Sequence, residues 1–325
     1  MGEVLEITKA LVSPIEKLID TTRKGVGLLY EPRHKRKMAD AAAYEINTIG
    51  EALRNNSDII VKYNNGYIDA NVPEFEEFVK RAQHRLNYQE LQKQYNIECV
   101  VDNAYAELES EENVSSEDVD ADWINRFFNS VEDISDKQMQ VLWGKILANE
   151  IQKPHSFSLR TLGVVKNLTK NEARLFCDIA PLILRCAGNE SRSFDDYFLP
   201  SGNHQLLEKY GIGFPQIIIL NESGIISEND LISIGVIIRP GETEYIYGDN
   251  KKIGFYNYGT TKERITHPAY ILTESGKELF PIIKKLQTIS SPNWYIQNFV
   301  NSITEYNTTV ISSEKKKIDT QIIDI

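Results

Sequence analysis

Two adjacent carboxylates, Asp195 and Asp196, followed by Tyr197, are the residues whose types and spacing best suit acid–base chemistry. Neighbouring carboxylates can hold their pKa values apart, so that one donates a proton while the other stays ionised. A solvated loop is the better interpretation of an isolated acidic pair, and we predict no catalytic residue and no enzymatic activity. A nuclease-type set of scattered acidic residues stays open, because it would depend on geometry alone.

The residue types that bind metals and cofactors are dispersed. Histidines stand at 34, 84, 155, 204 and 267, and no Cys-x-x-Cys pair exists. The chain also lacks a phosphate-binding GxxxxGK[ST] loop, an HExxH helix and a GxSxG nucleophile motif. We therefore expect no metal and no cofactor. Three cysteines, no apolar run of membrane-spanning length and no secretion signal predict a cytoplasmic protein.

The stretch SDKQMQVLWGKILANEI, residues 135–151, predicts an amphipathic helix that Ser135 and Gln138 cap together. Gly144 lies inside this helix at a cost of about 1 kcal/mol, so a neighbouring helix should approach closely there. We expect that neighbour to be the helix predicted at 122–131. Three polar residues fall outside the apolar stripe and are candidates for contact with a partner protein: Gln140, Lys145 and Glu150.

A second candidate surface lies in the stretch TEYIYGDNKKIGFYNYG, which predicts a β-hairpin with a Gly-Asp-Asn turn. Four cations in or beside it could contact phosphates: Lys251, Lys252, Lys262 and Arg264. Aromatic residues are interleaved with these cations along the sequence, and half of the aromatic residues must face the core. A structural or protein-binding hairpin is the alternative, since the preceding short helix, Phe214 to Glu222, has no Lys or Arg.

A third candidate surface is the amphipathic stretch LVSPIEKLIDTTRKGVGLLY with its basic flank. Such a segment can lie on an anionic bilayer, or it can pack as a helix on its neighbour. The membrane or anion contacts would be Arg33, Lys35, Arg36 and Lys37.

The net charge of −11 seems to argue against nucleic acid, but its distribution weakens that argument. Twelve acidic residues lie between Asp102 and Asp136, where Arg126 is the single base, so the rest of the chain is neutral. This segment resembles a solvated linker and leaves room for a basic face elsewhere.

The hydrophobic periodicity predicts a mainly α fold. We expect a helical N-terminal region at 1–110, an acidic linker at 111–121 and a helical core at 122–190. A winged-helix-like α+β module would follow at 191–310, with a mobile tail at 311–325. Within this scheme a long helix is expected over 73–108, and a capping box at Thr169 and Glu172 should begin another.

Residues 120–176 resemble the signature block of a bacterial family, domain of unknown function 2806. The matching residues are Asp122-Trp123, Ile134-Ser135-Asp136, Met139-Gln140, Leu142 to Lys145, Leu147-Ala148, Glu150 and Phe157 to Leu162. The match is specific over that block and looser over the first 180 residues. At His155 the sequence departs from the family, which often has Gly there.

The resemblance implies no catalytic residues. It suggests a non-enzymatic interaction or regulatory protein in bacterial anti-phage defence, similar in style to abortive-infection proteins. Its partner would be another protein or a second copy of itself. A DNA-binding regulator and a membrane-acting effector are the alternative functions, with DNA or a membrane surface as the partner.

Overall fold

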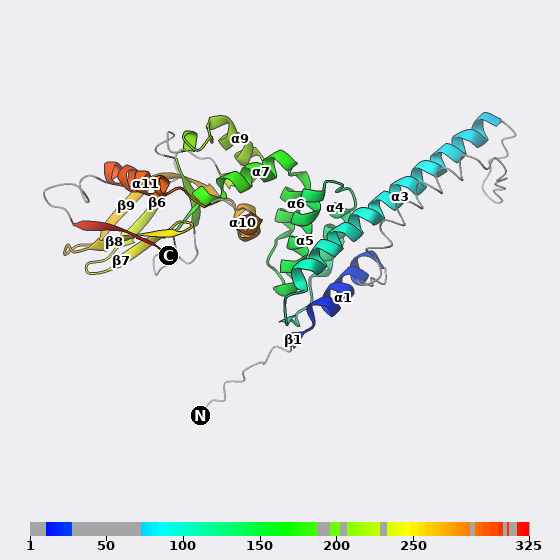
Figure 1. The fold of residues 1–325 in the computed structure, drawn as a ribbon, viewed down its shortest axis with the longest axis horizontal. Helices are drawn as coiled ribbons and strands as arrows, with labels where there is room; N and C mark the ends of the chain where they lie inside the picture. The colour runs from blue at the N-terminus through cyan, green and yellow to red at the C-terminus, as the bar shows by residue number, and fades with distance from the viewer. Residues whose placement is uncertain are drawn as a thin grey trace, which may run out of the picture. The chain divides into compact units, whose positions relative to one another are not determined.

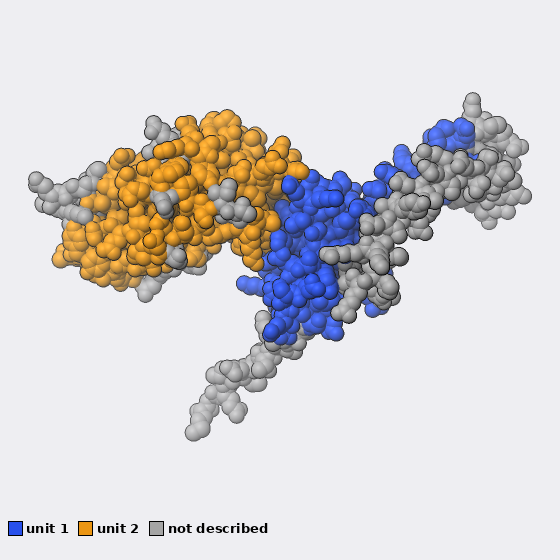
Figure 2. Space-filling view, viewed as in Figure 1, with its two compact units in different colours: residues 1–156 blue, residues 157–325 orange. Residues whose placement is uncertain are grey.

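The computed structural model describes residues 11–27, 73–186, 196–201, 207–227, 233–286, 290–307, 311 and 317–324. The chain divides into two compact units, residues 1–156 and 157–325, called unit 1 and unit 2 below (Figure 2). The division lies between Ser156 and Phe157, inside the segment expected to form one helical core.

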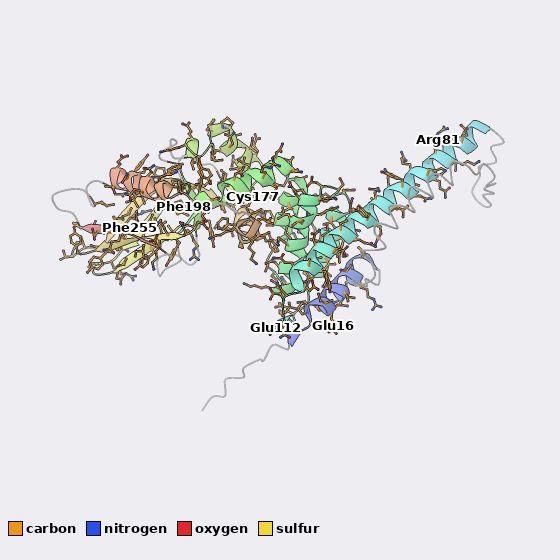
Figure 3. The ribbon with its side chains drawn as sticks, viewed as in Figure 1. Glu16, Arg81, Glu112, Cys177, Phe198 and Phe255 are labelled. Atoms are coloured by element: carbon orange, nitrogen blue, oxygen red, sulfur yellow. The ribbon has the colours of Figure 1, made fainter. Side chains whose placement is uncertain are left out.

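Unit 1 is helical in its described part. Its helices are α1 (Pro14–Val26), α3 (Pro73–Leu108), α4 (Ala121–Val131) and α5 (Lys137–Gln152). The helix expected over 73–108 is confirmed, and α5 lies along its C-terminal half (Figure 1). The N-terminal half of α3, where Figure 3 labels Arg81, carries exposed side chains that include Phe78 and Leu86.

The segment expected to be an acidic linker contributes to unit 1. Val114–Ser115 form a short strand, β2, that pairs antiparallel with β1 (Leu11–Val12). Val114 and Val119 are buried among the acidic residues. Apolar burial therefore holds this segment against the helices despite its charge.

An aromatic cluster fills the centre of unit 1. Trp123 stacks on Phe127, and the edge of Phe127 meets the Trp143 ring at a centroid distance of 5.4 Å. The predicted apolar stripe of α5 is confirmed, because all five of its members are buried: Met139, Leu142, Trp143, Ile146 and Leu147.

The neighbour of Gly144 is a helix, but it is not the one expected. A Cβ atom at Gly144 would lie 2.4 Å from the Asn103 Cβ and 3.0 Å from the Ala104 nitrogen and the Val100 oxygen. These atoms belong to α3, so the predicted contact with α4 was wrong. The backbones of α3 and α5 approach too closely for any side chain at this point.

The cap of α5 also differs from the prediction. Asp136 is the N-cap, and its carboxylate accepts hydrogen bonds from the backbone nitrogens of Gln138 and Met139. Asp is as good an N-cap as Ser. Which of the two adjacent candidates becomes the cap depends on which residues of α5 are buried. The capping box of Thr169 with Glu172 is confirmed.

Unit 2 combines helices with a large sheet. Its helices are α6 (Leu159–Asn167), α7 (Lys170–Ile179), the 3₁₀ turn η1 (Ala180–Leu182), α9 (Phe214–Glu222), α10 (Glu274–Leu286) and α11 (Asn293–Tyr306). Its strands are β3 (Leu184–Cys186), β4 (Asp196–Pro200), β5 (Ile226–Ser227), β6 (Ser233–Ile238), β7 (Thr243–Tyr247), β8 (Lys251–Asn257), β9 (Glu263–Leu272) and β10 (Ile318–Asp324).

These strands form one eight-stranded antiparallel sheet in the order β10-β8-β7-β3-β4-β9-β5, with β6 also paired to β9. The mainly α prediction with a winged-helix-like module was therefore wrong, and the fold is α+β. The β7–β8 hairpin was predicted correctly, but it is part of this sheet and not a two-stranded wing. Short apolar runs such as that of β6, SIGVII, carry too little periodicity to distinguish strand from helix.

The C-terminal segment, residues 311–325, was predicted to be a mobile tail, and part of it forms a strand. Residues 318–324 form β10, which pairs with β8 along its whole length, from Ile318 opposite Asn257 to Asp324 opposite Lys251. The isoleucines of this segment, at 318, 322 and 323, do not alternate with its polar residues, so only the pairing with β8 reveals the strand.

Helices pack against both faces of the sheet. On one face, α11 places Phe299 against Phe198 of β4 and His267 of β9, where the core also holds Phe255 (Figures 1 and 3). On the other face, Phe280 of α10 meets the ring of Tyr197 of β4 at 5.1 Å.

His267 joins α11 to β9 by a buried polar contact. Its Nε2 lies 2.9 Å from the Ser302 Oγ, and its Nδ1 lies 2.7 Å from the Pro268 carbonyl oxygen. The Pro268 contact requires Nδ1–H as the donor, so Nε2 accepts from the Ser302 hydroxyl. Burial lowers the pKa of His267, an effect that the Pro268 hydrogen bond partly opposes.

The lowered pKa of His267 predicts that unit 2 loses stability in mild acid. The unfolded chain binds more protons here than the folded chain once the pH falls below about 6.5. Neutral His267 therefore stabilises unit 2 above about pH 6.5. This stabilisation is lost as the pH falls below about 6.5, by at most about 1.4 kcal/mol per pH unit. Hydrogen exchange of β9 and α11 between about pH 8 and pH 5 measures this loss. A His267→Gln variant should show a smaller loss, and parallel profiles would contradict the prediction.

Candidate functional site

Gln140 is buried and holds the turn between α4 and α5. Its Nε2 donates to the Ile134 carbonyl oxygen at 2.8 Å and lies 3.4 Å from the Asn96 Oδ1. Asn96 of α3, also buried, donates to the Glu132 carbonyl oxygen at 2.8 Å. The two amides therefore satisfy backbone groups that the turn would otherwise leave buried without partners.

Lys145 forms an ion pair with Glu107 of α3, and both side chains are largely buried. The pair lies on the same α3–α5 seam as Gly144, where the helix backbones are closest. It joins the two helices beside that close contact.

Glu150 is 1% exposed and lies at the C-terminal end of α5. One carboxylate oxygen accepts from the His155 backbone nitrogen at 2.6 Å. Buried nearby, the Lys17 ammonium donates to the Ser115 and Ile151 carbonyl oxygens at 2.7 and 3.0 Å. Burial lowers the pKa of Lys17, while the charges of Asp118, Glu117 and Glu150 oppose that shift.

These contacts give each of the three candidate partner residues of α5 a role inside unit 1. Gln140 supports a turn, Lys145 joins two helices, and Glu150 balances a buried cation and fixes the loop after α5. We therefore look for a binding surface elsewhere.

The sheet of unit 2 brings tyrosines and cations together in a row that crosses four adjacent strands. Its register sets Tyr197 of β4 opposite Arg185 of β3, Arg185 opposite Tyr247 of β7, and Tyr247 opposite Lys252 of β8. Residues directly opposite in antiparallel strands lie on the same face. The row therefore alternates aromatic, cation, aromatic, cation across the sheet.

Both cations of this row form cation–π pairs, Arg185 with Tyr247 of the row and Lys252 with the neighbouring Tyr245 of β7. The Arg185 guanidinium carbon lies 4.8 Å from the centre of the Tyr247 ring, and the Lys252 Nζ lies 4.9 Å from that of Tyr245. Tyr256 lies farther along β8 on the same face and is 41% exposed. We call this surface the tyrosine face and define it by Tyr197, Arg185, Tyr247, Lys252, Tyr245 and Tyr256.

The structure separates the four cations that were predicted to contact phosphates. Lys252 belongs to the tyrosine face, whereas Lys251 pairs with Asp324 of β10 on the opposite face. Arg264 is exposed and falls on the side of the tyrosine face by the alternation of β9, and Lys262 is exposed just before that strand.

The predictions from the sequence did not include Arg185, nor did they assign Tyr197 to this surface. The available signal was a lone cation within the apolar run PLILRC, where Leu184 and Cys186 are buried and Arg185 is not. That alternation marks a strand with one open face.

Several other candidates lie outside the described residues. These are Asp195 of the acidic pair and all four predicted membrane contacts, Arg33, Lys35, Arg36 and Lys37. Asp196 opens β4. In the described part of the chain, no three His, Cys, Asp or Glu residues lie together as a metal ion would need. No helix within that same part is long and apolar enough to cross a bilayer.

A family model described as Protein of unknown function (DUF2806) matches residues 80–297, about two thirds of the chain. The chain belongs to the DUF2806 family. No curated protein and no solved structure gives a match. The DUF2806 region begins inside α3 and ends inside α11, so it includes α5 and every strand of the tyrosine face but not β10.

Position 155 has an unusual backbone geometry. His155 has a φ of 66° and is the one non-glycine residue with positive φ in the described ranges. Its ring Nε2 lies 3.5 Å from a Glu117 carboxylate oxygen, and both side chains are exposed. A left-handed backbone favours Gly, so His155 is strained at this position.

We expect His155→Gly to raise the free energy of unfolding of unit 1 by about 1 kcal/mol, because it relieves the left-handed strain. The backbone nitrogen that donates to Glu150 is kept. His155→Ala is the matched control, since it also removes the imidazole but leaves a Cβ at positive φ. Urea denaturation compares the two variants, and equal stabilities would refute the strain argument.

Proposed function

We propose that this protein is a non-enzymatic binding protein and that the tyrosine face of unit 2 is its binding surface. One observation carries the proposal: tyrosines and cations alternate across β4, β3, β7 and β8 on a single face. Tyr and Arg are the residues most enriched at the energetic centres of binding surfaces.

The partial exposure of these side chains supports the proposal, since none of them is fully buried and Tyr256 is exposed. Strands β7 and β8 lie inside the sheet with a paired strand on each side, so their backbones are satisfied. Ile246, Ile253 and Phe255 point to the α11 face and are fully buried. Tyr256 on the opposite face is 41% exposed, so that face is open to solvent at β8, whereas Phe280 of α10 covers it at Tyr197 of β4.

The chemistry of the buried polar groups favours binding over catalysis. Ser302 and His267 lie at a distance suited to a nucleophile and its base. However, both side chains are buried, and the rings of Phe299 and Tyr306 pack against the imidazole. The two rings block the approach of a substrate to Ser302 and His267. We therefore assign this pair a structural role.

Photo-cross-linking in cells tests the binding surface without assuming a partner. A photoreactive amino acid in place of Tyr256 should give discrete adducts, and Lys252→Gln in the same chain should weaken them. Glu305 is the control position, because it is exposed on α11 across the sheet. Adducts at 256 that are no stronger than those at 305 would remove the tyrosine face as the binding surface.

We also propose that this binding serves bacterial anti-phage defence. The proposal is supported by the resemblance of residues 120–176 to the DUF2806 family, which is similar in style to abortive-infection proteins. A host that carries the gene should reduce plaque formation by at least one phage of a diverse panel, and Lys252→Gln should weaken that protection. Equal plaque formation with and without the gene on every phage would remove this proposal.

A further inference from the structure

The tyrosine face combines two chemical properties on one side of the sheet. Its aromatic rings and the Arg185 guanidinium are planar groups that other planar groups can stack on. Lys252 and Arg264 add positive charge on the same side of the sheet. Neighbouring strands lie about 4.8 Å apart, so the row from β4 to β8 extends about 14 Å.

These properties match those of a single-stranded nucleic acid. Its bases offer planar faces to stack on aromatic and guanidinium groups, and its phosphates pair with Lys and Arg. An open sheet face of four strands can stack two or three bases. The acidic excess of the chain does not oppose this, because it lies in unit 1, whereas residues 157–325 have nearly equal numbers of basic and acidic residues.

We propose that the tyrosine face binds single-stranded RNA or DNA. Bases stack on Tyr245, Tyr247, Tyr256 and Arg185, while Lys252 and Arg264 contact the phosphates, and Tyr197 lies under Phe280 of α10 at the edge of this surface. This inference rests on the proposed function, since it names the class of partner for the same surface.

Two observations favour a single strand over other partners. Protein interfaces are depleted of Lys in their buried centres, yet Lys252 lies within this row. Duplex DNA is usually read by a helix placed in the major groove, and α9, the helix first considered for that role, exposes Phe214 and Ile219 and has no cation.

Adjacent lysines on opposite faces of β8 provide a matched pair of variants. Lys252→Gln removes a charge from the tyrosine face, and Lys251→Gln removes the same charge from the other face, where Lys251 pairs with Asp324. Both variants have the same net charge. Thermal melting of each full-length chain shows whether both are folded before binding is compared.

The binding experiment uses fluorescence anisotropy with a labelled mixed-sequence RNA of about 15 nucleotides, its DNA equivalent and the corresponding duplexes. The full chain should bind a single strand more tightly than its duplex, and binding should weaken as KCl rises. Lys252→Gln should weaken binding about fivefold and lower the salt slope by about one, whereas Lys251→Gln should change the affinity less than about twofold.

Three results would overturn the inference: no salt-sensitive binding of either single strand, tighter binding of the duplexes, or equal effects of the two Lys→Gln variants. The cross-linking at position 256 distinguishes this failure from failure of the proposed function. If the adducts contain protein and no nucleic acid, the inference is wrong while the binding surface stands. If no adducts form there, the binding surface itself is wrong.

Discussion

Gly144→Ala is expected to lower the free energy of unfolding of unit 1 by about 2 kcal/mol, although alanine is the better helix former. The new Cβ would lie 2.4 Å from the Asn103 Cβ and 3.0 Å from two backbone atoms of α3. Backbone atoms in the middle of a helix cannot rotate away, so α3 and α5 must separate. That separation would weaken the contacts that bury Trp143 and Ile146 on the same helix.

Gly163→Ala is the matched control for this change. Gly163 also lies inside a helix, α6, but a Cβ there meets nothing within 4 Å. The substitution should therefore stabilise the chain by up to about 1 kcal/mol through helix propensity alone. Urea denaturation followed by circular dichroism measures both variants. If Gly144→Ala were as stable as Gly163→Ala, the close approach of α3 and α5 would be refuted.

Glu150→Ala is expected to have the largest effect, a loss of about 3 kcal/mol from the stability of unit 1. The change removes a nearby negative charge from Lys17, whose ammonium is buried against two backbone carbonyls. It also removes the acceptor of the His155 backbone nitrogen. A buried charge that loses part of its compensation and an unsatisfied donor both destabilise a folded chain, although Asp118 and Glu117 still act on Lys17.

Two further variants divide the effect of Glu150→Ala into its causes. Glu150→Gln keeps a side-chain oxygen for the His155 nitrogen and loses only the charge, so it should lose less stability than Glu150→Ala. The double variant Lys17→Met with Glu150→Leu removes both charges and should recover part of the loss. Equal stabilities of Glu150→Ala and the wild type in urea would show that Glu150 has no structural role.

These stability predictions bear on function, because they assign the polar groups of α5 to folding. If they hold, variants of Gln140, Lys145 and Glu150 are poor tests of partner binding, since they change the fold of unit 1. Variants of Lys252 leave unit 1 untouched and remove one cation from an open sheet face. The tyrosine face is therefore the surface on which binding can be tested independently of folding.

Local features of the chain were predictable from the sequence. The helix over 73–108, the apolar stripe of α5, the capping box at Thr169 and the hairpin of β7 and β8 were all predicted. Each depends on residues close in sequence: a 3.6-residue period, a capping side chain or an alternation around a turn. The family resemblance was likewise carried by one continuous block of residues, and the family match confirms it.

The sequence alone left the long-range arrangement undetermined. Strands of three to seven residues, such as β3 and β10, are stabilised by partners far along the chain, so their own residues predict them weakly. The same limit explains why Gly144 was assigned to the wrong neighbour, since a close approach reveals that a partner exists but not which one. Only the register of β4, β3, β7 and β8 places Tyr197, Arg185, Tyr247 and Lys252 on one face. The residue types of the candidate site were therefore present in the sequence, while their convergence was decided by hydrogen bonding between distant strands.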